Sequence, residues 1–409
     1  MLCLCGLDRL HRSQEKEARD ALKGRLREKQ KRMTMFERKT YGILAVALLL
    51  LSACAKVSDD RSGEQMPVTF TTYGLQRTGT KADASYVAPG ADFAEGAVVG
   101  VYGFYHDNST FATDPDNIAD FMYHTALTKQ SDGSWTYSPI KYWPNEYGTG
   151  ANSTDIDRLS FWGYYPREAA GLNLYKPGTT TAYDNDTPGI PKATFTQKEN
   201  PDEMIDLMFS APLFDLYKTQ EHTENAETHN YGAVTDGQVT LKFRHALSLV
   251  EFQLAEGTGA KLNTLTLTKI KKTGTVEDCS TDPLVWSDVT GSYDLHKENV
   301  TVVGSTILTL LAIPQDLDAD ATFTLNYDIT FESSDPTHPD PIVYKGDSFS
   351  VKLFKKTGPV AEQYGVTAWQ PGKHYIYKIS AGLDRIEFEE IVEAGDDWTV
   401  GNNNISVPE

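Results

Sequence analysis

Few side chains in this sequence have the types and the spacing that catalysis or metal binding requires. His245 lies two residues after Phe243 in a segment whose inward side is apolar, so we expect a packed or hydrogen-bonded histidine. Cys279 has no base beside it in the sequence, which makes an ordinary thiol the default. A phosphate-binding glycine loop, a serine nucleophile elbow and an HExxH zinc motif do not occur in the 409 residues. The sequence therefore predicts no enzyme, no cofactor and no metal site.

Two further groups of polar residues could bind a cation only weakly. Asp114, Asp116 and Asp120 supply carboxylate oxygens, but the pattern lacks the glycine and terminal glutamate of an EF-hand. We expect a solvated acidic loop there. His222 and His229 lie among glutamates, where adventitious metal binding is the most that we expect. These scattered carboxylates and histidines are all that a hydrolase hypothesis would rest on.

One cysteine stands in a context that specifies its chemistry. Cys54 ends the tetrapeptide Leu-Ser-Ala-Cys, behind an apolar run at 43–51 and the basic pair Arg38 and Lys39. The run is shorter than the ~20 residues that span a bilayer, and the whole pattern is that of a signal peptide. It resembles the lipobox of bacterial lipoproteins, whose cysteine receives a diacylglycerol and, after cleavage, an acyl chain such as palmitate. Several chains together make a durable membrane anchor.

The residues before this signal look unlike the rest of the chain. Residues 1–32 are basic and helix-prone, which indicates that translation begins downstream, at Met33 or Met35. We therefore interpret 1–54 as a mis-annotated start plus a lipoprotein signal peptide, and the polar residues 55–67 as a tether. A short, uncleaved anchor helix with an incidental cysteine is the alternative.

Composition and charge limit the partners of the body of the protein. Hydrophobic residues make up 40% of the chain, enough to bury a core, and the formal net charge is −19. Residues 1–53 carry 12 basic and 6 acidic residues, so 26 basic and 51 acidic residues remain after them. So acidic a body repels phosphate, which makes nucleic acid a poor partner. With Cys3 and Cys5 outside the mature protein, no internal disulfide is expected.

The sequence after residue 54 is typical of β-structure. Thr322 to Phe331 alternates apolar and polar residues, which places five apolar side chains on one face of a strand. Val239 to Phe243 alternates too, and the phase slips before Val250, which indicates a break or bulge between two strands. No segment after residue 54 keeps a helical period for three turns. We predict an all-β fold of two β-sandwich domains, 68–236 and 237–409. The linker between them forms the last part of the first range.

Several sequence blocks occur in an order that resembles the fimbrillin-like lipoproteins of the Bacteroidota, the subunits of the type V pilus. The blocks are Trp143-Pro144, the segments 159–166, 239–248 and 369–377, Trp286 and Trp398. The resemblance implies two transthyretin-like (Ig-like) β-sandwich domains after a lipoprotein signal. It also implies an outer-membrane or cell-surface fimbrium that supports adhesion. Its subunits are matured by an arginine-specific protease and joined by a strand that each donates to the next.

The resemblance can be carried onto particular residues. Val68 to Tyr73 is the strand that would be removed, and Arg77 the cleavage site, with Lys81 as a second basic option. Alternatively, Arg77 is an ordinary loop arginine of an anchor or non-polymerising subunit. The donor would be the C-terminal run 385–407, which could equally complete its own domain.

A surface glycan-binding lipoprotein is the alternative function. It rests on an aromatic-rich stretch whose rings could stack on sugars, although filling the core of the first sandwich explains the same residues more simply. The stretch comprises Tyr142, Trp143, Trp162, Tyr164 and Tyr165.

Overall fold

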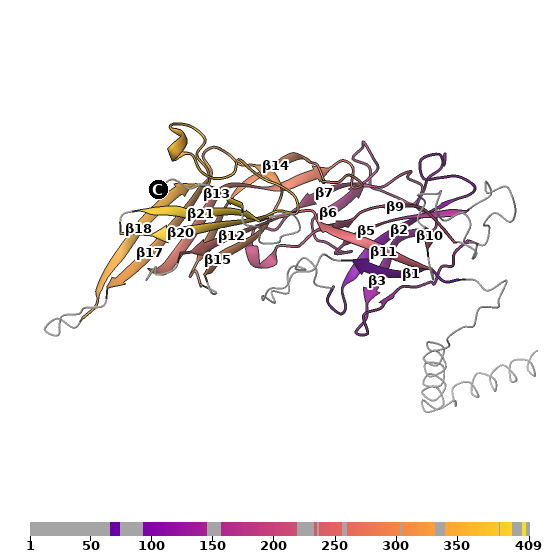
Figure 1. Cartoon of the computed structure of the whole chain (residues 1–409), viewed down its shortest axis with the longest axis horizontal. Coiled ribbons are helices and arrows are strands. Elements are labelled where there is room, and N and C mark those ends of the chain that lie inside the picture. Colours follow the sequence, from indigo (N-terminus) through magenta and orange to yellow (C-terminus); the bar gives the residue numbers. More distant parts are fainter. Residues whose placement is uncertain are drawn as a thin grey trace, which may run out of the picture. The chain divides into compact units, whose positions relative to one another are not determined.

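Almost all regular structure in the described part of this protein is β-strand. The computed structural model describes residues 66–73, 93–144, 157–218, 233–234, 237–255, 260–302, 305–331, 340–383, 385–394 and 403–405, all within the unit Gln65–Glu409 (Figure 1). Besides strands, these residues form two short 3-10 helices, η1 (Pro201–Glu203) and η2 (Val360–Glu362). Among them no helix has the length and apolar character that crossing a bilayer demands.

The first sheet has nine strands, seven of them in the order β1-β11-β8-β5-β2-β3-β4, while β9 pairs with β5 and β10. Figure 1 shows β1 lying along β11. The bounds are β1 (Thr69–Tyr73), β2 (Val98–His106), β3 (Met122–Lys129), β4 (Trp135–Thr136), β5 (Arg158–Tyr165), β8 (Met208–Ser210), β9 (Leu213–Lys218), β10 (Ala233–Val234) and β11 (Gln238–His245).

Two further sheets pack face to face. One has the order β15-β12-β20-β21-β22 and the other β18-β17-β13-β7-β6, with β14 also on β13. Phe252 stacks between Phe323 and Tyr377, with ring centroids 4.6 and 4.9 Å away, so the sheets enclose a shared core. The bounds are β6 (Leu172–Tyr175), β7 (Lys192–Thr196), β12 (Ser248–Leu254), β13 (Ala260–Val276), β14 (Trp286–Glu298), β15 (Thr306–Ala312), β17 (Thr322–Phe331), β18 (Ile342–Lys352), β20 (His374–Ala381), β21 (Ile386–Ala394) and β22 (Asn403–Ile405); β16 (Gln315–Asp316) pairs separately with β19 (Ala368–Trp369).

The predicted all-β fold is confirmed, and the strand patterns explain why. β17 occupies the predicted alternating segment, and its inward residues Phe323, Leu325 and Tyr327 are buried. The predicted break near Leu247 is the point where β11 ends and β12 begins. Alternation therefore located these strands because one face of each is covered by a core.

The sheets do not change at the predicted domain boundary between residues 236 and 237. β11 follows that boundary but pairs with β1 and β8 of the first sheet. β7 precedes it but pairs with β13. Strand pairing therefore crosses the boundary in both directions, and the division into two domains stays a prediction.

Candidate assembly site

β1 is an edge strand that reaches its neighbour from far along the chain. It runs parallel to β11, from Thr69 opposite Gln238 to Tyr73 opposite Lys242. Parallel neighbours need a long connection, and here the intervening residues supply the other strands of the sheet. β1 is therefore the strand that completes this edge of the sheet.

The inward side chains of β1 and the residue before it are part of the core. Val68 is 1% exposed and Phe70 is 4% exposed. The ring of Phe70 packs edge-on against Tyr137 and Phe161, at centroid distances of 5.5 and 5.4 Å. Burying each such side chain contributes about 1.5–3 kcal/mol. The segment is thus held by two apolar sites at alternate positions.

The residues just before β1 are also hydrogen-bonded on the side away from β11. The backbone N–H of Val68 donates to the carbonyl of Lys141 at 2.9 Å, and the Tyr137 hydroxyl donates to the carbonyl of Val68 at 2.7 Å. The N–H of Trp143 donates to the carbonyl of Met66 at 2.9 Å. β1 and the residues leading into it therefore lie between β11 and the segment 137–143.

Gly237 lies beside the start of β1 and bonds to it. Its carbonyl accepts from the N–H of Thr69 at 2.9 Å and from the indole N–H of Trp143 at 3.1 Å. Gly237 has φ +68°, and a Cβ there would lie 2.8 Å from the carbonyl oxygen of Pro67. Only glycine fits both the left-handed backbone and the close approach.

Without β1, the β11 backbone from Gln238 to Lys242 would lose its partners, and the sites of Val68 and Phe70 would be empty. An extended segment with apolar side chains at alternate positions would satisfy both losses, which is β-augmentation. The geometry therefore defines a strand-shaped slot.

The two predicted modification sites, Cys54 and Arg77, lie outside the described residues, as does Lys81. In the sequence, Arg77 follows Tyr73, the last residue of β1, by four positions. Cleavage there would separate β1 from the body of the protein.

The C-terminal run divides into two parts. β21 pairs with β20, and its side chains Ile386, Phe388 and Ile391 are buried in the core. β22 covers only Asn403–Ile405 and pairs with β21 at the end of the sheet. Donation of the whole run 385–407 would take β21 out of its own core, and donation of any part of the run stays a prediction.

A Ser–His–Asp relay, which the sequence analysis missed, lies in the first sheet. His106 bonds through Nδ1 to Asp114 at 2.8 Å and through Nε2 to Ser160 at 2.9 Å. The groups match a serine-hydrolase triad, but Ser160 is 1% exposed and its hydroxyl also accepts from the N–H of Asp215 at 3.0 Å. With the hydroxyl closed to substrate, the relay serves to join β2 and β5 to the loop that carries Asp114.

The relay corrects the prediction of a solvated acidic loop for Asp114 only, because Asp116 and Asp120 are exposed as predicted. Burial alone would raise the pKa of Asp114, but hydrogen bonds from His106 and from the backbone N–H groups of Asn117 and Asp116 outweigh it and lower that pKa. Among the described residues, no group of three or more His, Cys, Asp or Glu side chains is placed to hold a metal.

His245 and Cys279 lie in buried environments without a reactive role, as their sequence contexts predict. His245 Nδ1 bonds to the carboxylate of Asp206 at 3.0 Å, and both side chains are buried. Cys279 is a free, fully buried thiol, and burial raises its pKa. Neither geometry presents a reactive group to solvent.

Three of the five aromatic residues that suggested glycan binding lie in the core, and Tyr165 is partly buried. Trp143, Trp162 and Tyr164 are buried, while Tyr142 is exposed. Trp162 stacks on Tyr164 with centroids 5.6 Å apart. Core filling therefore accounts for these rings, as the simpler interpretation predicted.

Over the described residues, the strand order defines an all-β protein whose first sheet has β1 as its edge strand. Residues 80–393 match the family model for fimbrillin-like proteins, so the chain belongs to the fimbrillin-like family. This confirms the family resemblance of the sequence blocks. None of the curated proteins matches the chain.

Solved structures resemble the chain over most of its length. They include a "putative cell adhesion protein" from Bacteroides uniformis, at 15% identity and a TM-score of 0.44, covering 83% of this chain and 100% of that one. Another from Bacteroides ovatus has 14% identity and a TM-score of 0.45, covering 84% and 100%. The tip fimbrial protein Mfa3 from Porphyromonas gingivalis has 11% identity and a TM-score of 0.33, covering 74% and 95%.

Proposed function

We propose that this protein is a structural or accessory subunit of a surface fimbria, assembled by proteolysis-triggered strand exchange and supporting adhesion. Membership of the fimbrillin-like family supports the fimbrial role. The observation that carries the mechanism is β1 itself, a five-residue edge strand paired with β11 and followed four residues later by Arg77. No enzymatic activity forms part of the proposal.

Export comes first. The signal at 35–54 directs the chain out of the cytoplasm, and acylation of Cys54 anchors it in the outer membrane. The anchor and β1 lie on the same side of Arg77 in the sequence. One cut after Arg77 therefore detaches the body from both the lipid and the edge strand.

Cleavage lowers the apparent affinity of β1 for its place beside β11. In the intact chain β1 is tethered, so its effective concentration at the slot is high. After the cut it is a separate peptide whose contacts must offset the full entropy of association. The apolar sites of Val68 and Phe70, together with the backbone ladder on β11, then become available to a competing strand.

The competing strand is the C-terminal segment of a neighbouring subunit, and it begins after Ala394. Ile405-Ser406-Val407 and Trp398-Thr399-Val400 each repeat the apolar-polar-apolar order of Val68-Thr69-Phe70. Either could place two apolar side chains in the slot while β21 stays in its own core. Because donor and acceptor surfaces differ, the contact is head-to-tail and generates an open filament.

Arginine-specific proteolysis of residues 55–409 tests the proposal. We expect one product beginning at Thr78, followed by an SDS-resistant ladder of oligomers. Arg77→Ala should abolish both, whereas Lys81→Ala should leave both unchanged. Cleavage elsewhere, or cleavage without any ladder, would contradict the proposed assembly.

A further inference from the structure

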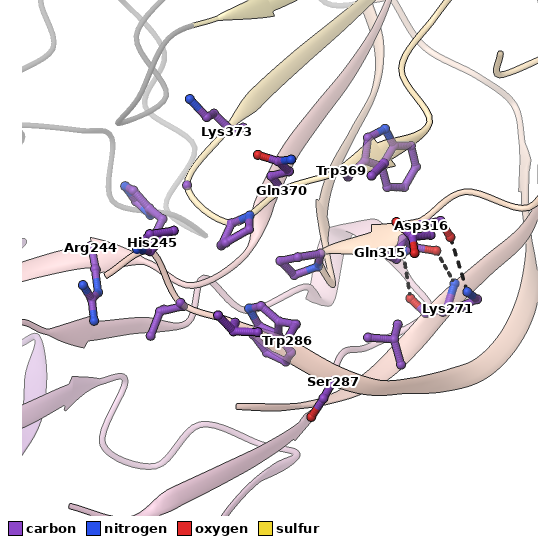
Figure 2. A pocket seen from close by; sticks show the side chains of 18 of the residues that line it. Arg244, His245, Lys271, Trp286, Ser287, Gln315, Asp316, Trp369, Gln370 and Lys373 are labelled. Atoms are coloured by element: carbon purple, nitrogen blue, oxygen red, sulfur yellow. Dashed lines mark hydrogen bonds between the residues drawn. The ribbon is translucent and has the colours of Figure 1, made fainter. Parts of the chain in front are cut away.

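A pocket of about 950 Å³ lies away from β1, beside the end of β11 and the start of β14 (Figure 2). Figure 2 shows Arg244 and His245 on one side of it and Trp369, Gln315 and Lys271 on the other. The remaining walls come from the loop that precedes β14 and the turn that follows β19. The volume lies within the range of ~300–1,000 Å³ typical of small-ligand sites.

Trp286 presents a fixed aromatic ring to this pocket. Its indole N–H donates to the carbonyl of Ala246 at 2.8 Å, which sets the plane of the ring. Beneath the ring lies Gly274 of β13, where a Cβ would be 2.7 Å from Trp286 Cε3. The missing side chain lets the indole lie close to the strand, and Trp286 remains partly exposed.

The polar groups around the ring carry both charges in equal number. The cations are Arg244, Lys271 and Lys373, and the anions are Asp282, Asp288 and Asp316. The Arg244 guanidinium donates through Nη2 to the carbonyls of Cys279 and Thr281 and lies 3.1 Å from Asp282, while its Nε and Nη1 have no hydrogen-bond partner among the described residues. A site balanced in this way suits a neutral ligand.

The balance also indicates the ligand's hydrogen-bonding character. Carboxylates accept, ammonium groups donate, and the exposed amide of Gln370 does both. A ligand rich in hydroxyl groups can pair with all three, because each hydroxyl both donates and accepts. The carbon-bound hydrogens of a sugar ring can meanwhile lie on the electron-rich face of the indole.

We propose that this pocket binds a short neutral oligosaccharide, with one sugar ring stacked on Trp286. The site goes beyond fimbrial assembly, since it uses no residue of β1 or of the slot. It would give the subunit a ligand of its own at the cell surface.

Titration of residues 55–409 labelled with ¹⁵N-tryptophan tests this proposal. The probes are maltotriose, mannotriose and N-acetyllactosamine, with a decaproline peptide as the competing ligand class. We expect at least one sugar to shift the Trp286 indole resonance while those of Trp135, Trp143 and Trp162 stay fixed. No shift with any sugar, or a shift with decaproline alone, would overturn the proposal.

Variants separate stacking from general effects. Trp286→Ala should weaken sugar binding about tenfold or more, whereas Trp286→Phe should retain most of it. Gln370→Ala, at an exposed position, should weaken binding about fivefold without affecting the fold. Tyr344→Ser removes an exposed ring outside the pocket and should change nothing. Equal affinity in Trp286→Ala, Gln370→Ala and Tyr344→Ser would also overturn the proposal.

Discussion

Substituting Phe70 by alanine probes the slot most sharply, because its effect should depend on whether β1 is present. Phe70 is 4% exposed and packs between Tyr137 and Phe161. Truncating a buried phenylalanine costs about 3–5 kcal/mol, since both the transfer free energy and the contacts around the ring are lost. We place Phe70→Ala near the lower end, about 3 kcal/mol, because an edge strand can relax more readily than a central one. Urea unfolding followed by tryptophan fluorescence measures the loss.

Protein that has been cut after Arg77 and freed of the β1 peptide no longer contains residue 70, so Phe70→Ala and the wild type then yield the same molecule. Phe161→Ala is the matched control, because Phe161 lies in the same core but on β5, which stays with the body. It should destabilise both the intact and the cut protein. A loss below about 1 kcal/mol for intact Phe70→Ala would refute the account of the slot.

Three other predictions concern positions around the site. Gly237→Ala should destabilise the intact protein by about 1–3 kcal/mol, measured by urea unfolding, because of its positive φ and the 2.8 Å approach to Pro67; an unchanged midpoint would contradict this. Asp114 has a lowered pKa, so its contribution is present above the unfolded-state pKa and is lost as pH falls through the folded-state value. Asp114→Asn should therefore be less stable than the wild type at pH 7 and converge with it in thermal melts as pH falls through the folded-state pKa of Asp114, which lies below its ordinary value; a difference that stays constant into the acid range would count against the relay with His106. Cys279 should resist iodoacetamide at about pH 8 until urea unfolds the protein, because the thiol is fully buried and its pKa is raised; labelling of the folded protein would contradict its burial.

Alternation revealed much of the fold because it records which face of a strand is covered. β17 could be read from the sequence in this way, and so could the junction of β11 and β12. β1 was also expected as a strand. Its parallel partner could not be foreseen, because alternation carries no information about which distant strand lies beside it.

The relay and the pocket were not predictable for a related reason. His106, Asp114 and Ser160 meet only after β2 pairs with β5, and no local motif links them. Trp286 appeared in the sequence as one block of a family pattern, with nothing to indicate that Gly274 would lie beneath its ring. Predictions about Cys54 and Arg77 came from short motifs and stay predictions.

Mass spectrometry of subunits taken from surface fimbriae tests the central claim most directly. The account predicts that assembled subunits begin at Thr78, without lipid and without β1. Assembled subunits that begin at acylated Cys54 and still carry residues 69–73 would contradict it, because the slot would then be filled by the subunit's own strand.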